Sequence, residues 1–522
     1  MHYGIMLLFS FWLAIQLSAL GGSASDRARA NALFGTPQVL DIKIEISPEA
    51  MRSLKQQPRV YVLANIRQGD TVYTNVHVRI RGSAGSFRPV TDKPGLTIKI
   101  DKGAQRFHGL KKFHLNNSVQ DRTYLNEWIC DDMFRSAGVP SLRVTHAWVE
   151  LNGRTLGPYL LKESFNEDFL AQYFKNTKGN LYGQSGGADV NRRLYQMRGK
   201  AEDAHADLRA LAAAAQESDP AQSWQRLEEV LDVDRFLSFM AMEVMLCHGD
   251  GYTFGTHNFR VYHDLDTGKM VFFPHDMDQM LGDSNRSIIP QTGALVVRAV
   301  MRSAEGRTRY RERFGLLFTN VFQPASLNAR IDEYVSAVAP ALRERSARLA
   351  TDFQAGARNL KERIRNRAAG IEKQLIPAKP LAFENNVARI QTWRKRHQPA
   401  TSEMSEAAVD GRPVLRILCA ESAAAASWRA NVLLEAGRYR FSGRARLAGV
   451  IPRTGAPRSG VFLRVAHGPR QEGLSGDTDW ESVQHEFSIQ ENQREIVLVC
   501  ELYALEGEVL FDKDSLQLER LP

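Results

Sequence analysis

Alternating apolar and polar positions predict strands in the first part of the chain. Between residues 38 and 100, four segments alternate with a period of two and are rich in β-branched residues: VLDIKIEIS, RVYVLANIRQ, TVYTNVHVRIRG and LTIKID. Turn-forming residues separate them, as they do between the strands of a sheet. A strand pair is also predicted in VTHAWVELNGRTLGPYLLKES, because Asn152-Gly153 is a strong hairpin turn.

The pattern then becomes helical. Residues 122–137 show helical periodicity that stops at Gly138 and Pro140, and the segments 165–246 and 298–375 are also mainly helical. Strands that lead into a large helical part predict an α+β domain with two lobes.

The last part of the chain has a different texture. Residues 376–409 contain several prolines among basic and polar residues, and we interpret them as a linker. Beyond residue 410, strand-like segments separated by short turns predict an all-β sandwich. These segments are VLRILC, GRYRFSGRARLAG, SGVFLRVAHG, WESVQHEFSIQ, REIVLVCELYAL and GEVLFDKDSLQLERL.

An apolar run from Ile5 to Leu20 opens the chain, and small residues follow it. We interpret residues 1–24 as a cleaved secretory signal, with an uncleaved anchor as the alternative. The mature chain then begins near Ser25 and is secreted, periplasmic or held at the cell surface. No later apolar run is long enough to span a membrane.

Composition adds a few constraints. The 522 residues exceed one ordinary domain, and the formal net charge of +9 favours anionic partners, although solubility alone explains it equally well. We expect no nucleic-acid partner. The four cysteines form no CxxC pair, which argues against a zinc site built on thiolates.

Candidate chemistry concentrates in HGDGYTFGTHNFRVYHDLDTGKMVFFPHDMDQML, residues 248–281. Asp250 and Asn258 precede a predicted hairpin, and Asp276 and Asp278 follow it. Carboxylate and amide oxygens are the ligands that Mg²⁺ prefers, and such sites leave room for substrate phosphates. The plain alternative is that these aspartates only cap turns.

The same segment resembles the signature of the CotH (spore coat protein H) family of atypical kinases. The elements that carry the resemblance are Asp250-Gly251, His257-Asn258, Tyr262 and Pro274-His275-Asp276-Met277-Asp278. Upstream segments agree in order: RIRGSAGSF, KPGLTIKI, KKFHLNNSVQDRTYLNEWICDDMFRSAGVPS, LNGRTLGPYLLKE and GNLYG. The resemblance covers roughly residues 40–375, within a domain expected at 25–375.

The resemblance implies a kinase-like fold that transfers the γ-phosphoryl group of ATP to Ser or Thr of a protein substrate. Mg²⁺ is the expected metal, with Mn²⁺ as an alternative. On that template Asp276 is the principal metal ligand and a catalytic residue, Asp250 is the catalytic acidic group and Asn258 is a further ligand. Asp278 competes with Asp276 for the metal.

Residues of the first lobe are candidates for binding the nucleotide. Arg81, Lys93 and Lys99 are available for the phosphates, and Lys99 alternates with apolar neighbours as a lysine facing a cleft or solvent does. Glu127 could pair with such a lysine. Glu163 is a further candidate for the nucleotide cleft.

Two histidines in this segment bear on the resemblance: His275 departs from the family pattern, and His248 is a candidate for proton transfer. His275 stands where the family has Trp, so the packing there differs. His248 precedes Asp250 by two residues and could assist proton transfer.

Residues 410–522 resemble jelly-roll carbohydrate-binding modules, which implies a possible polysaccharide ligand. Trp428 and Trp480 could stack on a sugar but are more often core residues. In jelly rolls the chain's ends lie close together, so we expect a Cys419–Cys500 disulfide, with Cys130 and Cys247 unpaired.

Two rivals to an exported kinase stay open. One is a catalytically silent cell-surface protein on the same scaffold. The other is a carbohydrate-active accessory protein whose sandwich carries the function.

Overall fold

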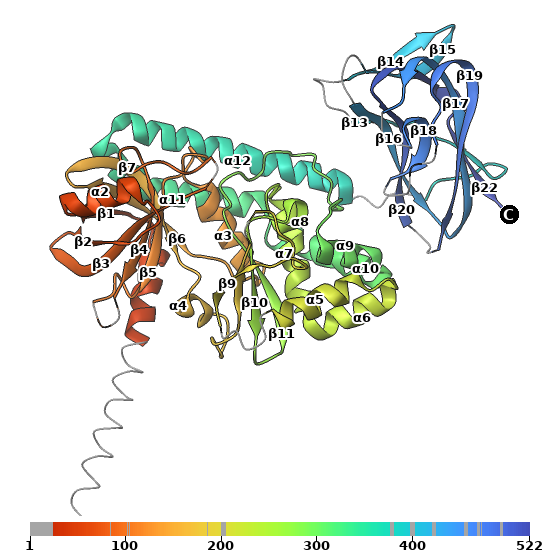
Figure 1. Cartoon of the computed structure of the whole chain (residues 1–522). Helices are drawn as coiled ribbons and strands as arrows, with labels where there is room; N and C mark the ends of the chain where they lie inside the picture. The colour runs from red at the N-terminus through yellow and green to blue at the C-terminus, as the bar shows by residue number, and fades with distance from the viewer. Residues whose placement is uncertain are drawn as a thin grey trace, which may run out of the picture. The chain divides into compact units, whose positions relative to one another are not determined.

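The computed structural model describes residues 24–522 except 84, 102, 104, 185, 200–204, 376–379, 397–401, 420–423, 454–457, 467–469, 471 and 491–493. Residues 1–23 of the expected signal peptide lie outside the described residues. The chain divides into two compact units, Met1–Leu375 and Ile376–Pro522 (Figure 1). Among the described residues, we find no helix that combines the length and the apolar character needed to cross a bilayer.

The first unit begins with a helix at residues 24–35 and a closed barrel of seven strands in the order β1-β2-β3-β4-β5-β7-β6. The parallel pairing of β1 with β6 closes it. The predicted period of two holds: Val76, Val78 and Ile80 of β3 are buried. The elements are β1 Val39–Glu45, α2 Pro48–Gln56, β2 Val62–Gln68, β3 Thr71–Arg81, β4 Gly95–Ile100, β5 Lys112–Asn116, β6 Val144–Leu151 and β7 Arg154–Glu163.

Helices and a small sheet complete the first unit. The helices are α3 Asn126–Ser136, α4 Glu167–Leu170, α5 Ala206–Gln216, α6 Pro220–Val230, α7 Val233–Met245, α8 Tyr252–Gly255, α9 Leu295–Arg302, α10 Ala304–Asn320, α11 Pro324–Arg345 and α12 Ala347–Leu375. The sheet has the order β11-β10-β8-β9, with β8 Leu181–Gly183, β9 Tyr195–Arg198, β10 Phe259–Asp264 and β11 Lys269–Pro274. The segment 165–246 is therefore less helical than predicted, because β8 and β9 are short strands that form only by pairing.

Two helices set the frame around the β10–β11 hairpin. Helix α7 is buried almost all round, and its Phe236 ring packs 4.8 Å from that of Phe272 in β11. Helix α12 runs along the first unit (Figure 1), and its Arg367 is fully buried. Arg367 donates to the backbone carbonyls of Val244 and Met245 at 2.9 and 3.0 Å. These bonds fix the end of α7, just before the segment with Asp250.

The second unit is a β-sandwich, as predicted, with one apolar core between two sheets. One sheet has the order β12-β22-β17-β21-β15-β14, with β19 paired to β17, and the other has the order β13-β16-β20-β18. The strands are β12 Val387–Arg389, β13 Arg394–Arg396, β14 Glu403–Val409, β15 Arg412–Cys419, β16 Ala424–Leu434, β17 Gly437–Ile451, β18 Gly460–Val465, β19 Gly476–Ile489, β20 Arg494–Ala504, β21 Glu506–Asp512 and β22 Gln517–Leu521, with a short 3-10 helix at Lys513–Ser515.

Two expectations for this part of the chain are wrong. The segment 376–409 is not simply a linker, because β12, β13 and β14 pair with sandwich strands and Trp393 is buried in the core. The four cysteines are all free and buried. Cys419 and Cys500 lie in different sheets, where apolar surroundings accommodate each as a small hydrophobic residue.

Candidate active site

A cavity of about 1200 Å³ lies between the barrel and the segments around the β10–β11 hairpin, and we call it the cleft. It brings together five of the predicted residues: Arg81, Asp250, Asn258, Asp276 and Asp278. Side chains that the sequence analysis did not select also line it, among them Asn116, Asn117, Arg260 and Arg286.

The hairpin explains why the acidic residues meet. Strands β10 and β11 pair from Phe259↔Pro274 onward, and the His275 amide donates to the Asn258 carbonyl at 2.9 Å. The residues just before β10 and just after β11 therefore lie at the same end of the hairpin. There the Asn258 amide donates to a carboxylate oxygen of Asp250 at 2.9 Å, which orients that carboxylate in the cleft.

The backbone is held in an uncommon conformation at this end. Asn258 and Asp276 have φ of 42° and 56°, and Cys247, three residues before Asp250, has φ of 54°. Left-handed backbone costs a non-glycine residue of the order of 1–3 kcal/mol, and such residues cluster at functional sites. Asn and Asp tolerate it best.

Asp276 and Asp278 form a crowded pair of carboxyl groups. Burial raises the pKa of Asp278 to about 8, and the neighbouring Asp276 and Glu127 carboxylates add to the rise. Asp278 therefore keeps its proton at neutral pH until a cation offsets the negative charge.

The carboxyl groups of Asp276 and Asp278 are candidate ligands for a metal ion. No group of three or more His, Cys, Asp or Glu side chains within the described part of the chain is arranged to hold a metal ion. Mg²⁺, however, is commonly bound by one or two carboxylates together with substrate phosphates. Asp276 and Asp278 fit that second kind of site, in which the substrate completes the coordination.

A buried ion pair lies beside these carboxylates. Lys162 on β7 forms an ion pair with Glu127 on α3, and Asp131 lies 3.8 Å from the same ammonium. Burial lowers the pKa of Lys162, but the charges of Glu127 and Asp131 outweigh this and raise it overall, with a contribution from Asp276. Asn116 donates to Glu127 at 2.6 Å. Glu127 thus does pair with a lysine, but the lysine is Lys162 and not Lys99.

Strand register explains why Lys99 was the wrong choice. The cross-strand row of Arg79, Thr97, His114 and Lys162 passes over the outer face of the barrel. Lys99 belongs to the neighbouring row, and its side chain is exposed and does not line the cleft.

Lys93 does not line the cleft either. Its ammonium donates to the Tyr124 hydroxyl at 2.8 Å and lies 5.1 Å from the Tyr159 ring centroid. Burial lowers its pKa to about 8, against a smaller opposing effect of Asp92. This lysine holds the edge of the barrel rather than a phosphate.

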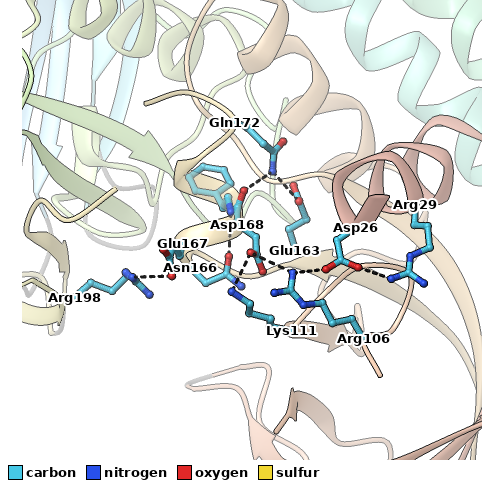
Figure 2. Close-up of polar contacts among 11 residues, drawn as sticks. Asp26, Arg29, Arg106, Lys111, Glu163, Asn166, Glu167, Asp168, Gln172 and Arg198 are labelled. Atoms are coloured by element: carbon cyan, nitrogen blue, oxygen red, sulfur yellow. Dashed lines mark hydrogen bonds and ion pairs between the residues drawn. The ribbon is translucent and has the colours of Figure 1, made fainter. Parts of the chain in front are cut away.

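Glu163 also lies outside the cleft, in a polar cluster that fixes the N-terminal helix (Figure 2). It accepts from Arg143 at 2.6 Å and from Gln172 at 3.0 Å. In the same cluster Arg106 lies 2.8 Å from Asp26 and 3.7 Å from Asp168 (Figure 2). Glu163 is therefore structural.

The cleft has cationic groups with unused donors, one on barrel strand β3 and one on hairpin strand β10. Within the described residues, Nη1 of Arg81 and Nε of Arg260 are buried without a hydrogen-bond partner. Burial lowers the pKa of Arg260 to about 10, against the opposing charge of Asp276, so it stays protonated. Burial and the nearby Arg260, Lys162 and Arg81 charges lower the pKa of His275 well below its usual range, so it is uncharged. Two guanidinium groups that each have a buried, unpaired N–H and line one cleft are a site for an anion.

His248 is held by a buried carboxylate. Its Nδ1 lies 3.2 Å from Glu243, which also accepts from the Tyr252 and Thr253 amides at 3.1 and 2.6 Å. A Cβ on Gly251 would lie 2.3 Å from Glu243, so only glycine fits there. Glu243 therefore shapes the loop that presents Asp250, and His248 lines the cleft.

A scan against protein families matches the model described as CotH kinase protein over residues 78–371, more than half of the chain. The chain belongs to the CotH kinase protein family. The family resemblance drawn from the motif around residues 248–281 is thereby confirmed.

Curated CotH relatives are distant. The inner spore coat protein H of Bacillus subtilis is 25% identical over 189 residues, which cover 34% of this chain and 51% of that protein. Invasin CotH3 of Rhizopus delemar is 22% identical over 246 residues, which cover 40% of this chain and 41% of that protein. The chain thus spans about half the length of these relatives or less.

Solved structures match the second unit weakly. TmCBM61 in complex with β-1,4-galactotriose is 15% identical, with a TM-score of 0.20, over 27% of this chain and 100% of that chain. The CBM22-1 xylan-binding domain of Paenibacillus barcinonensis Xyn10C is 15% identical, with a TM-score of 0.17, over 25% of this chain and 87% of that chain. Scores this low do not identify a ligand.

Proposed function

We propose that the chain is an exported protein kinase that transfers the γ-phosphoryl group of ATP to Ser or Thr of a protein. The observation that carries the proposal is the charge pattern of one cleft. Arg81 from barrel strand β3 and Arg260 from hairpin strand β10 each bring a buried N–H without a partner to the cleft, and a crowded carboxyl pair follows the hairpin. A nucleotide triphosphate with its metal ion complements both.

The residues divide the work by their positions. Arg81 and Arg260 bind phosphate oxygens through their unused N–H groups. Lys162 does not itself line the cleft, but it is held by Glu127 and adds a fixed positive charge near Asp276 and Asp278. Asp276 and Asp278 would hold a metal ion, and Asn258 would be a further ligand. The metal ion, when bound, neutralises phosphate charge and orients the leaving group.

Asp250 acts on the attacking hydroxyl. Its carboxylate is oriented by the Asn258 amide and accepts the proton as the hydroxyl attacks. One P–O bond forms to the acceptor oxygen, the bond to the β-phosphate oxygen breaks, and ADP leaves. His248 positions the loop that carries Asp250.

Transfer of label from γ-labelled ATP to a Ser/Thr protein, with Mg²⁺ or Mn²⁺, tests this function. Wild-type protein should transfer label, Asp276→Ala should not, and Asp70→Ala should match wild type because Asp70 is an exposed turn residue on the barrel. Absence of both nucleotide binding and transfer in the wild type would favour the catalytically silent alternative. Export rests on the expected signal and is checked by the N-terminal sequence of the secreted chain.

We propose polysaccharide binding as a separate role of the second unit. Trp428 is a core residue, but Trp480 is only partly buried, with Arg412 and Arg446 at 5.8 and 5.4 Å from its ring. An accessible indole can stack on a sugar ring. Affinity electrophoresis with soluble polysaccharides should show retardation that Trp480→Ala removes.

A further inference from the structure

A second cavity, of about 430 Å³, adjoins the cleft on the side of helix α8. Gly187, Gly255 and Thr256 line it, and Arg192 and Arg298 supply its cationic groups. We call it the acceptor groove.

The acceptor groove and the cleft share a wall next to Asp250. A Cβ built on Gly255 would lie 3.6 Å from the Asp250 Cα, although Gly255 lines the groove and Asp250 lines the cleft. The Thr256 hydroxyl donates to the Gly187 carbonyl at 2.9 Å, which fixes this wall. A chain that presents a hydroxyl to Asp250 can therefore continue directly into the acceptor groove.

Arg286 connects the two cavities. It lines the cleft, its guanidinium lies 4.4 Å from the ring centroid of Phe254 in the groove wall, and a Cβ on Gly249 would lie 3.5 Å from its Nη2. Its own carbonyl accepts from buried Arg367 at 2.7 Å. The backbone at Arg286 is thus anchored, and the guanidinium charge of Arg286 lies next to the segment of Asp250.

These cations lack anionic partners. Within the part of the chain that the structure describes, the side chains of Arg192, Arg286 and Arg298 form no ion pair or side-chain hydrogen bond. This differs from Arg309, which lies 2.8 Å from Glu228 and 2.9 Å from Asp234.

The nearby carboxylates accept hydrogen bonds from donors other than these arginines. Asp189, in the groove, accepts from the Tyr252 hydroxyl at 2.9 Å and the Leu295 amide at 2.7 Å. In the cleft, Asp250 accepts from Asn258, and Asp283 accepts from the Asn285 amide at 3.0 Å. The guanidinium groups remain available to an outside anion.

We propose that the substrate of this kinase is an acidic protein segment, with Asp, Glu or a phosphorylated residue a few positions from the acceptor Ser or Thr. This inference rests on the proposed function and adds the substrate class to it. Arginine pairs well with carboxylate and phosphate oxygens because its planar fork offers two parallel donors. Arg192 and Arg298 are exposed, so the preference weakens as salt concentration rises.

Matched peptides test the proposal in two ways. A Ser peptide flanked by Asp is compared with the same peptide carrying Asn, by label transfer and by fluorescence anisotropy of peptide binding to the full chain. Wild type should favour the acidic peptide, and each lost guanidinium should reduce the acidic-to-neutral ratio by about fivefold, as for a partly exposed ion pair. The variants are Arg286→Gln and the double change Arg192→Gln with Arg298→Gln.

Controls separate this inference from the proposed function. Arg52→Gln, an exposed arginine on α2, should keep the wild-type ratio. Arg286→Glu should shift the preference toward a Lys-flanked peptide, which a merely structural arginine would not do. Equal transfer to both peptides would overturn the inference about the substrate, while the proposed kinase activity would stand. Binding of the acidic peptide without any transfer would overturn the proposed kinase activity. The inference that this surface binds acidic segments would then stand without it.

Discussion

Replacing Lys162 by Met tests the buried charge cluster most sharply. Lys162, Glu127 and Asp131 side chains are 4%, 0% and 2% exposed, so the change removes one cation and leaves two carboxyl groups with almost no water contact. The loss of one partner from a buried pair costs about 3–5 kcal/mol, because the remaining charge is uncompensated. We expect the first unit of the variant to lose about that much unfolding free energy at neutral pH.

The deficit should depend on pH. Without the opposing charge of Lys162, the folded-state pKa of Asp131 lies further above its unfolded value, so stability present at low pH is lost as pH rises through the folded value. Burial already raises the pKa of Asp131 to about 6 in the wild type, against the opposing charge of Lys162. The deficit should therefore be smallest near about pH 5 and grow toward about pH 8.

Scanning calorimetry of the full chain, with the transition of residues 24–375 followed across that pH range, measures the effect. Lys111→Met is the matched control: the Lys111 side chain is 43% exposed and its ammonium lies 3.4 Å from Asp168, so the change should alter stability by less than about 1 kcal/mol. A Lys162→Met loss below that bound, or one that does not change with pH, would refute the reasoning.

Three further predictions concern the cleft. Asp276→Ala should abolish Mg²⁺-dependent ATP binding in calorimetry with the fold intact; unchanged affinity would move the metal role to Asp278. Asp250→Asn should reduce label transfer far more than ATP affinity, since a group that acts on the attacking hydroxyl matters most in the transition state; a parallel loss of binding would make it a ligand. Gly251→Ala should lower transfer by displacing the loop from Glu243, and transfer equal to wild type would contradict the packing at that glycine.

The acidic site was predictable because its residues are close in sequence. Asp250, Asn258, Asp276 and Asp278 flank one hairpin, and hairpin pairing brings its ends together wherever it forms. Most barrel strands were predictable from their period of two, but the short β5 was not predicted. Closure of the barrel was not predictable either, because the pairing of β1 with β6 joins strands about a hundred residues apart.

The cationic side of the cleft was harder to predict. Lys99 lies between two isoleucines, whereas Lys162 lies between Leu161 and Glu163, so the sequence pattern favoured Lys99. Only the register of β4, β5 and β7 shows that the row of Lys162 faces α3 and the row of Lys99 faces water. Arg260 lies in an apolar strand whose pattern gives no sign that its side chain reaches the cleft. In the second unit, β16 was missed because AAASWRANVLL is rich in alanine and reads weakly as a strand.

The central claim is that this cleft transfers phosphate. The most direct test incubates the purified full chain with γ-labelled ATP, Mg²⁺ and an acidic Ser/Thr protein, and assays phosphoserine and phosphothreonine in wild type, Asp276→Ala and Asp70→Ala. The account predicts label on Ser or Thr in wild type and Asp70→Ala, and none in Asp276→Ala. Label that persists in Asp276→Ala, or its absence from wild type with either Mg²⁺ or Mn²⁺, would contradict it.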